Sequence, residues 1–233
     1  MNNPSLLAQD HAEPQVIVLR VRNWFIKNYS YLVVEPTTRH AVLVDPAWEM
    51  ATICRGLADA DVQLRGILLT HSHFDHVHLA EPLADRYDCP IWMSSVEIAA
   101  SGFCARQLVG IGSAPWTVGR MLIEPILTPG HTPGSTCYLI GSGLFSGDVL
   151  FAEGCGWCHD LPAAHAMFAS LERLKALAPG TRVFSGHSYG APPGQLLSRV
   201  RHDNVYLQFP TKESFAAYRL RSGQSWVKRF QFR

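Results

Sequence analysis

A short apolar run that ends in histidines and an aspartate constrains the fold of this chain more than any other feature. The run at residues 66–70 has the length and composition of a buried strand. Four potential metal ligands follow within the next six positions: His71, His73, Asp75 and His76. Imidazole and carboxylate groups are ligands that zinc and iron take in proteins. Because His71 and His73 alternate, both rings can point to one side of an extended loop. The stretch therefore predicts a metal-binding loop at the end of a buried strand.

Three more residues of ligand type stand farther along the chain, each at an expected strand end or loop. Glycine directly precedes each of them: His131, Asp148 and His187. Glycine has no side chain, so it lets the backbone approach closely and adopt unusual torsion angles. One such residue alone is more often structural. Together with the first cluster, however, the three complete a set of seven candidate ligands.

The order of expected elements is that of an α/β protein. Strands are expected near residues 16–21, 24–26, 31–34, 41–45, 66–70, 90–93, 136–140, 143–148 and 182–187, and helices near 49–60, 77–87, 163–177, 193–208 and 211–220. Residues 27–30 are expected to form the turn of a hairpin, and residues 100–119 a loop or short helices beside the site. Strands followed by a helix occur twice, which predicts two β-plus-α halves packed sheet to sheet with helices outside.

Composition sets broad limits. The 233 residues are 47% apolar and 17% charged with a net charge near +1, which is typical of a globular protein without a general attraction to nucleic acid or membranes. The first residues lack the pattern of a secretory signal, and no apolar run reaches membrane-spanning length, so a cytoplasmic protein is expected. Cys155 and Cys158 form a C-x-x-C pair, but no second pair completes a structural zinc site.

The series His71-x-His73-x-Asp75-His76, His131, Asp148 and His187 resembles the motifs of the metallo-β-lactamase superfamily. The resemblance covers about residues 15–190. It implies a four-layer αββα sandwich, with residues 1–233 as one metallo-hydrolase domain and a short helical extension from about 191 to 233. It also implies two zinc ions, with iron or manganese as alternatives. The implied ligands are His71, His73 and His131 for the first ion, Asp75, His76 and His187 for the second, and Asp148 between them. Asp75 would also act in catalysis by orienting water or relaying a proton.

Three segments resemble the glyoxalase II-like branch of this superfamily, whose members hydrolyse thioesters such as acyl-glutathione. The segments are residues 147–151, 154–156 and 186–189. Tyr189 matches a family tyrosine near the substrate. Trp157 departs from the pattern, because family members usually place there a lysine or arginine that helps bind glutathione. The segment after His187 is also short for the family's glutathione-binding domain. True β-lactamases generally lack the bridging aspartate, so Asp148 argues against lactam hydrolysis.

The chain is also compatible with a subgroup that accompanies modular polyketide synthases and whose implied substrates are acyl groups on carrier proteins. A zinc-dependent hydrolase of such acyl thioesters is therefore the first hypothesis. The alternatives are a glutathione thioester hydrolase, an iron-dependent persulfide dioxygenase and a non-catalytic binding module. The complete ligand set argues against the last of these.

Residues outside the ligand set are predicted to contact the substrate or a partner. Trp157 and Tyr189 are predicted to bind substrate. Phe103, Trp116 and Phe151 are further candidates for an acyl pocket, although an aromatic residue of this kind is more often part of the core. His159 follows the loop Gly154-Cys155-Gly156 and is a candidate to reach the metal site. A basic C-terminal segment is a candidate docking surface for an acidic carrier protein or the phosphate of its arm. Its cations are Lys212, Arg219, Arg221, Lys228, Arg229 and Arg233.

Overall fold

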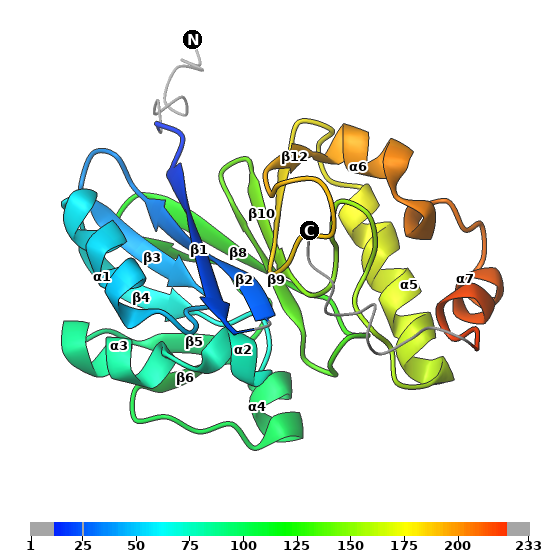
Figure 1. The fold of residues 1–233 in the computed structure, drawn as a ribbon, viewed down its shortest axis with the longest axis horizontal. Coiled ribbons are helices and arrows are strands. Elements are labelled where there is room, and N and C mark those ends of the chain that lie inside the picture. Colours follow the sequence, from blue (N-terminus) through cyan, green and yellow to red (C-terminus); the bar gives the residue numbers. More distant parts are fainter. Residues whose placement is uncertain (1–11, 25, 223–233) are drawn as a thin grey trace, which may run out of the picture.

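Two six-stranded sheets pack face to face, with helices on both outer faces. The computed structural model describes residues 12–24 and 26–222 (Figure 1). The first sheet, in spatial order, consists of β1 (Gln15–Asn23), β2 (Ile26–Val34), β3 (His40–Val44), β4 (Gln63–Leu68), β5 (Ile91–Ser94) and β6 (Leu108–Ile111). The second consists of β12 (Gln195–Leu196), β11 (Arg182–Ser185), β10 (Gly143–Gly147), β9 (Thr136–Ile140), β8 (Met121–Leu127) and β7 (Trp116–Val118). The predicted αββα sandwich is confirmed.

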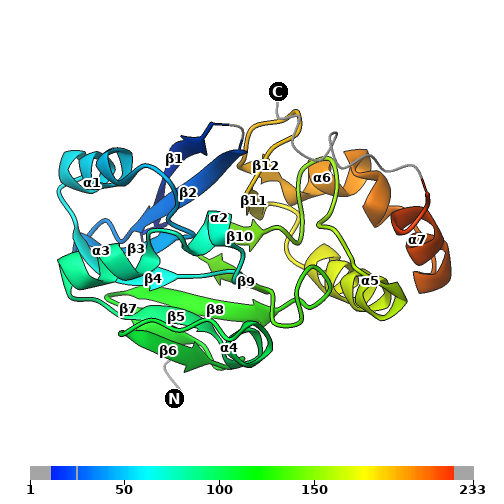
Figure 2. The same ribbon diagram turned by 60° about the horizontal axis from the view of Figure 1, so that its bottom comes forward.

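Most helices cover the two outer faces, whereas α2 lies at the edge of the sandwich (Figures 1 and 2). The first half contains α1 (Met50–Asp59), α2 (Phe74–Val77), α3 (Ala80–Tyr87) and α4 (Ser95–Ser101). The second contains α5 (Leu161–Lys175), α6 (Leu197–Asp203), the 3₁₀ helix η1 (Val205–Leu207) and α7 (Lys212–Arg219). No helix within residues 12–24 and 26–222 is long and apolar enough to cross a lipid bilayer.

Each pair of neighbouring layers buries its own apolar cluster. Between the sheets, the rings of Tyr31, Phe145 and Phe184 pack with centroids 5.2 to 5.5 Å apart. Outside the second sheet, α5 begins at an Asp160 side chain that accepts a hydrogen bond from the Ala163 amide at 2.8 Å, which caps the helix. Large rings fill the centre of the sandwich, so strand ends rather than strand middles remain available for a polar site.

Four segments differ from what the sequence predicted, and two of them were expected to lack strands. Residues 27–30 are not a turn, because β2 runs unbroken from Ile26, and Asn23 pairs with Ile26 across the hairpin. The buried polar residues of that stretch, Asn28 and Ser30, bond to the loops around the candidate site instead of forming a turn. Residues 100–119 contain the end of α4 and a loop, but they also contribute β6 and β7, short edge strands paired with β5 and β8 that were not expected.

Two expected helices are interrupted. The segment at 193–208 divides into β12, α6 and η1, since Asn204 leaves the helical conformation and its side chain accepts from the Tyr206 amide at 2.9 Å. The helix expected at 77–87 is two helices, α2 and α3. The first of them starts at Phe74 and so includes part of the histidine cluster that was expected in a loop.

Parallel strand pairs bring the polar strand ends together. β3 runs parallel to β4 in the first sheet, and β10 runs parallel to β11 in the second. The carboxyl ends of parallel neighbours lie at the same edge of a sheet. The segments that follow these four strands carry Asp45, the cluster beginning at His71, Asp148 and His187, and they meet at one edge of the sandwich.

Candidate metal centre

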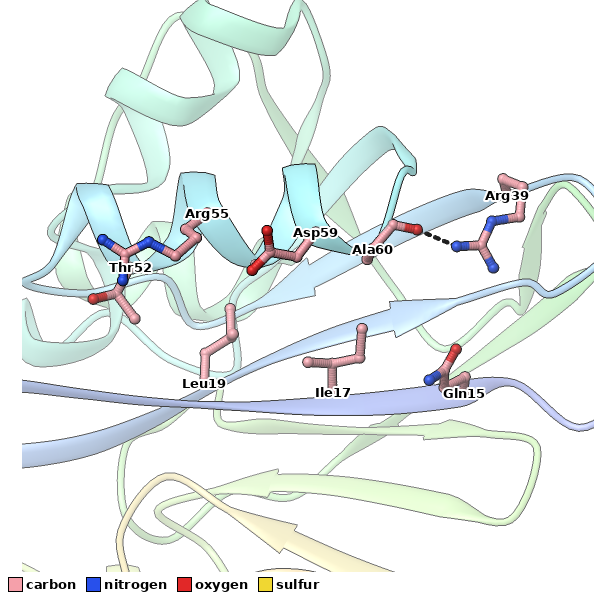
Figure 3. A pocket seen from close by; sticks show the side chains of 9 residues that line it. Gln15, Ile17, Leu19, Arg39, Thr52, Arg55, Asp59 and Ala60 are labelled. Atoms are coloured by element: carbon pink, nitrogen blue, oxygen red, sulfur yellow. Dashed lines mark hydrogen bonds between the residues drawn. The ribbon is translucent and has the colours of Figure 1, made fainter.

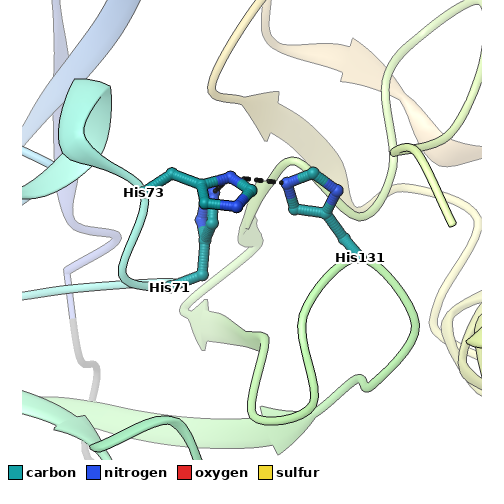
Figure 4. Close-up of side chains that lie close together, drawn as sticks. All are labelled: His71, His73 and His131. Carbon is teal, nitrogen blue, oxygen red and sulfur yellow. Dashed lines mark hydrogen bonds between the residues drawn. The ribbon is translucent and has the colours of Figure 1, made fainter. Parts of the chain in front are cut away.

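Three histidines converge from two loops (Figure 4). His73 Nδ1 lies 3.0 Å from His71 Nε2 and 3.0 Å from His131 Nε2. His71 and His73 follow β4, and His131 follows β8. Ligand nitrogens on one tetrahedral zinc ion are about 3.3 Å apart, given Zn–N distances of about 2.0–2.1 Å. The three nitrogens are therefore close to the spacing that one such ion requires.

A second group forms beside the first, from Asp75, His76 and His187. Asp75 Oδ2 lies 3.2 Å from His187 Nε2 and 3.7 Å from His76 Nε2. One ligand atom from each residue fits within 4.8 Å of the other two. Each of the two groups thus offers three nitrogen or oxygen donors to a shared point.

Asp148 stands between the two groups. Its Oδ1 lies 3.4 Å from His76 Nε2 and 3.6 Å from His187 Nε2, whereas its Oδ2 lies 3.7 Å from His131 Nε2. Each carboxylate oxygen therefore faces a different group. This is the arrangement that a carboxylate shared by two cations needs.

Two buried atoms at this junction support binding of cations. Asp148 Oδ1 and His76 Nε2 are shielded from solvent, and neither has a hydrogen-bond partner. Buried polar atoms in native proteins almost always have a partner, and the exceptions need an explanation. A divalent cation would satisfy both atoms at once, so the residues present fit a metal centre.

The superfamily is established by comparison of the whole chain. The sequence model of the metallo-beta-lactamase superfamily matches residues 24–187. The chain belongs to the metallo-beta-lactamase superfamily.

Similar proteins cover nearly the whole chain. The probable polyketide biosynthesis zinc-dependent hydrolase BaeB of Bacillus velezensis is 44% identical over 88% of this chain and 92% of its own length. The counterpart PksB of Bacillus subtilis is 37% identical over 92% and 96%. The hydroxyacylglutathione hydrolase of Alkalilimnicola ehrlichii is 31% identical over 83% and 74%. Among solved structures, ETHE1 from Myxococcus xanthus superimposes with a TM-score of 0.77 at 27% identity, covering 92% of this chain and 94% of that one.

In this superfamily member, Asp45 orients one of the candidate ligands. Its Oδ2 accepts a hydrogen bond from His76 Nδ1 at 2.9 Å and from the Thr70 hydroxyl at 2.6 Å, and its Oδ1 accepts from the Thr70 amide at 2.8 Å. With its proton on Nδ1, His76 presents Nε2 to the centre. The sequence interpretation placed Asp45 only in a strand. The signal that found the other ligands, a polar residue directly after an apolar strand, was also present here.

Backbone carbonyls orient two more rings. His131 Nδ1 donates to the Trp157 carbonyl at 3.0 Å, and His187 Nδ1 donates to the Lys27 carbonyl at 2.8 Å. Both rings therefore direct Nε2 toward Asp148. Since a carbonyl accepts from any histidine, no side-chain pattern in the sequence could reveal these partners.

Asn28 and Glu97 are two further positioning residues that the sequence interpretation missed. Asn28 Nδ2 donates to Asp75 Oδ2 at 3.1 Å and to the Asp75 carbonyl at 2.9 Å. The buried Glu97 accepts from the Ser72 amide and hydroxyl at 2.9 and 2.6 Å, and from the Thr132 hydroxyl at 2.7 Å. Glu97 thereby ties the loop of His71 to the loop of His131. Both positioning residues belong to other elements, far from these loops in the sequence.

Burial and neighbouring charges favour metal-binding protonation states at several of the candidate ligands, whereas the carboxylates of Asp148 and Asp75 outweigh burial and raise the pKa of His76 and His187. Burial lowers the pKa of His131 to about 4 and, with the neighbouring His76, lowers the pKa of His71 well below its usual range. Burial by itself would raise the pKa of Asp148 and Asp75, but adjacent histidines hold both carboxyls well below their usual pKa. Two neutral imidazoles and two ionised carboxylates are the forms that bind metal.

Glycine lets the backbone of the second sheet approach the centre, as the sequence predicted. A Cβ on Gly186 would lie 2.5 Å from His76 Cε1 and 2.8 Å from Asp148 Oδ1. Gly147 has φ +48° and its Cβ would lie 2.3 Å from the Thr70 hydroxyl oxygen. A side chain is therefore excluded at both positions. At Gly186 it would collide with candidate ligands.

We expect Gly186→Ala to reduce metal binding by at least about tenfold, because the added methyl group must displace His76 or Asp148 and misplaced ligands cost affinity. Metal titration of the chelator-treated protein would measure the loss. Gly180→Ala is the matched control, since a Cβ there meets nothing within 4 Å. Equal metal affinity in both variants would contradict the close packing around Gly186.

Of the predicted substrate residues, Tyr189 and Phe151 lie beside the centre. Their rings are 5.1 Å apart, and the Phe151 ring is 6.4 Å from that of His187. Burial raises the pKa of the Tyr189 hydroxyl, so it remains protonated and can donate a hydrogen bond. Phe103 and Trp116 instead pack against core clusters, which is the alternative that the sequence left open for them.

The two cysteines in and after the Gly154-Cys155-Gly156 loop are buried, whereas the histidine that follows them is not. His159 is exposed. Cys155 and Cys158 are buried free thiols, and burial raises the pKa of Cys158 to about 11. A thiol with such a pKa is protonated and unreactive near neutral pH.

Arg219, which the sequence interpretation grouped with the basic C-terminal segment, is buried. It is 7% exposed, and its guanidinium lies 4.9 Å from the Trp157 ring centroid and 5.5 Å from that of Tyr206. It also donates to the Tyr206 hydroxyl at 3.0 Å. Arg219 thus fastens α7 to the loop whose carbonyl orients His131. Lys212 and Arg221 are exposed, and Lys228, Arg229 and Arg233 lie outside the described residues.

We expect Arg219→Leu to lower the free energy of unfolding by about 2 kcal/mol, the size of a desolvated cation–π contact. Arg219→Lys should retain part of this energy, because it keeps the cation but not the planar guanidinium. Urea unfolding of the two variants beside Arg199→Leu, an exposed arginine on α6, provides the measurement. Equal stability of Arg219→Leu and Arg199→Leu would contradict the role of this contact.

A separate surface pocket lies on the outer face of the first sheet (Figure 3). It encloses about 490 Å³ between α1 and β1 and is lined by Gln15, Ile17, Leu19, Arg39, Thr52, Arg55, Gly56, Asp59 and Ala60. The Arg39 guanidinium donates to the Ala60 carbonyl across one end of it. None of the candidate ligands lines this pocket, so the chemistry belongs to the sheet edge instead.

Proposed function

We propose that this protein is a two-zinc hydrolase that cleaves acyl thioesters carried on a carrier protein. The observation that carries the proposal is Asp148, whose two oxygens face two separate groups of ligands. The relatives from Bacillus velezensis and Bacillus subtilis support zinc-dependent hydrolysis, since both are named probable polyketide biosynthesis zinc-dependent hydrolases. A carrier protein is the form in which such biosynthesis holds its acyl groups.

The proposed ligands follow from the two groups. His71, His73 and His131 would hold one ion, Asp75, His76 and His187 would hold the other, and Asp148 would contact both. When bound, such a pair of cations makes water nucleophilic near neutral pH and polarises a carbonyl. The side chains of the protein would orient the reacting groups and transfer the proton that the water loses.

Asp75 is the proposed catalytic carboxylate. Asn28 holds it in place, and its low pKa means that it remains ionised near neutral pH. It can therefore orient the attacking water and pass the proton to solvent rather than keep it. The leaving thiol has an ordinary pKa of about 8.5, so it departs as a thiolate with little need for an acid. This explains why a thioester can be cleaved without a serine nucleophile or a strong general acid.

Trp157 and Tyr189 remain proposed substrate contacts. Tyr189 can donate its hydroxyl to a substrate carbonyl or amide near the centre. Trp157 stands where glutathione-binding relatives usually place a cation, so a carrier-bound substrate fits this chain better than acyl-glutathione. The hydroxyacylglutathione hydrolase among the relatives makes glutathione thioesters the alternative to be tested.

Hydrolysis of an N-acetylcysteamine thioester tests the proposal. We expect release of thiol that stops with a chelator and returns with added zinc. Carrier-protein, coenzyme A and glutathione thioesters of the same acyl group should then be compared, and the highest kcat/KM is expected for the carrier protein. No thiol release from any of these thioesters by the zinc-loaded protein would refute the proposal.

A further inference from the structure

The hairpin of β1 and β2 carries a row of positive charges. Arg20 stands opposite Tyr29, and Arg22 stands opposite Lys27. Arg20 and Arg22 are exposed, and Lys27 is half-buried. Directly opposed residues of antiparallel strands share one face of the sheet. Arg20, Arg22 and Lys27 therefore form a single patch, here called the hairpin basic row.

The hairpin basic row lies on the rim of the candidate metal centre. It shares its face with Tyr29, which stacks on the inter-sheet residue Tyr31 with ring centroids 6.4 Å apart. The Tyr29 hydroxyl is 3.4 Å from Ser188 Oγ, and the Lys27 carbonyl accepts the hydrogen bond from His187. The row thus continues the inner face of the first sheet outward to the loop that carries a proposed ligand.

The fold makes no evident use of these charges. Within the described part of the chain, no ion pair involves any of the three cations. The carboxylate of Glu49 accepts from the backbone amide of Arg22 at 3.3 Å, not from its guanidinium. Like charges directly opposite one another destabilise a strand pair. The pairing of Arg22 with Lys27 therefore calls for an explanation other than stability.

Protection of a sheet edge explains only part of the row. β1 is an edge strand, and charged side chains on such strands prevent unwanted pairing. Lys27, however, lies on β2 before its pairing with β3 begins at Tyr31, where hydrogen bonds to Gly186 and His187 already cover the strand. Trp24 at the tip of the hairpin is 92% exposed, the opposite of what protection requires. Aromatic and arginine side chains together are typical of protein interfaces.

We propose that the hairpin basic row and Trp24 form the docking surface for an acidic carrier protein whose thioester arm enters the metal centre. The inference rests on the proposed function and adds the surface that selects the substrate. A positive rim attracts an acidic protein and the phosphodiester of its arm, and it speeds their encounter. It also lies beside the place where the thioester must react, so docking and chemistry occupy one edge of the sandwich.

Charge reversal on the hairpin tests the proposal. We expect Arg20→Glu/Arg22→Glu to raise KM for a carrier-bound acyl thioester by about tenfold or more at low salt, with no change in kcat. The difference from wild type should shrink as salt is added, because rim charges are screened. Hydrolysis of the N-acetylcysteamine thioester should not change. Arg65→Glu/Arg120→Glu is the control, since it reverses two exposed charges on β4 and the β7–β8 turn.

Several outcomes would overturn the docking surface. They are an unchanged KM for the carrier-bound thioester, an equal rise for carrier-bound and small thioesters, an equal rise in the control variant, or an equal loss with a coenzyme A thioester. The last would show that a phosphate rather than a carrier protein is recognised. Should the double glutamate variant melt early, Arg20→Gln/Arg22→Gln replaces it, with a smaller rise expected. Failure of the proposed function is distinct, since the wild-type protein would then hydrolyse no thioester at all.

Discussion

Replacing Asp148 with alanine is expected to reduce thioester turnover by more than about 100-fold and to lower the metal content of the protein. Loss of a residue that only orients a ligand typically costs about 10–100-fold, and Asp148 directly faces both groups of candidate ligands. Without its carboxylate, two positive ions would face each other with less negative charge between them. Turnover of the thioester and metal analysis of the purified variant measure the two effects.

Asp148→Asn is the matched control for this prediction. It preserves the shape and one oxygen but removes the negative charge, so it should retain more metal than alanine yet remain far slower than wild type. Wild-type rates in the alanine variant would contradict a role for Asp148 between two ions.

Replacing Asp45 with asparagine is expected to weaken both folding and metal binding, although Asp45 is not itself among the proposed ligands. The side chain is buried and accepts three hydrogen bonds, from His76 and from the amide and hydroxyl of Thr70. An amide cannot accept all three. We expect a loss of about 3 kcal/mol in the free energy of unfolding and a loss of 10–100-fold in metal affinity.

Glu35→Gln separates the two effects. Glu35 is also a buried acid whose carboxylate accepts backbone hydrogen bonds, but it lies in the turn between β2 and β3. Its replacement should reduce stability, measured by urea unfolding, while leaving metal affinity at the wild-type value. An Asp45→Asn variant with normal metal affinity would show that the orientation of His76 does not matter.

The seven candidate ligands could be predicted because each carries a local signal. Five of them stand in loops or turns after a strand, and Asp75 and His76 lie in the short helix α2. Two parallel strand pairs then bring most of these segments to one edge. The layered fold followed from the same alternation of strands and helices. Asp45 offered the same signal and was overlooked. Asn28 was misread as part of a turn, because polar residues inside a strand look like a break until their partners are known.

Residues whose role depends on distant contacts could not be predicted. Glu97 joins two loops from a helix that follows β5, and nothing in its local sequence indicates this. Arg219 was grouped with the basic C-terminal segment, because its burial depends on how α7 packs against Trp157. β6 and β7 were missed because they are short edge strands whose pairing, rather than their residue pattern, defines them.

Metal analysis of the protein as purified, with oxygen uptake measured on the same sample, tests the central claim most directly. The two ligand groups and Asp148 predict about two zinc ions per chain and no oxygen consumption with a persulfide. A single iron per chain, together with oxygen consumption on a persulfide and no thiol release from thioesters, would contradict the two-zinc hydrolase.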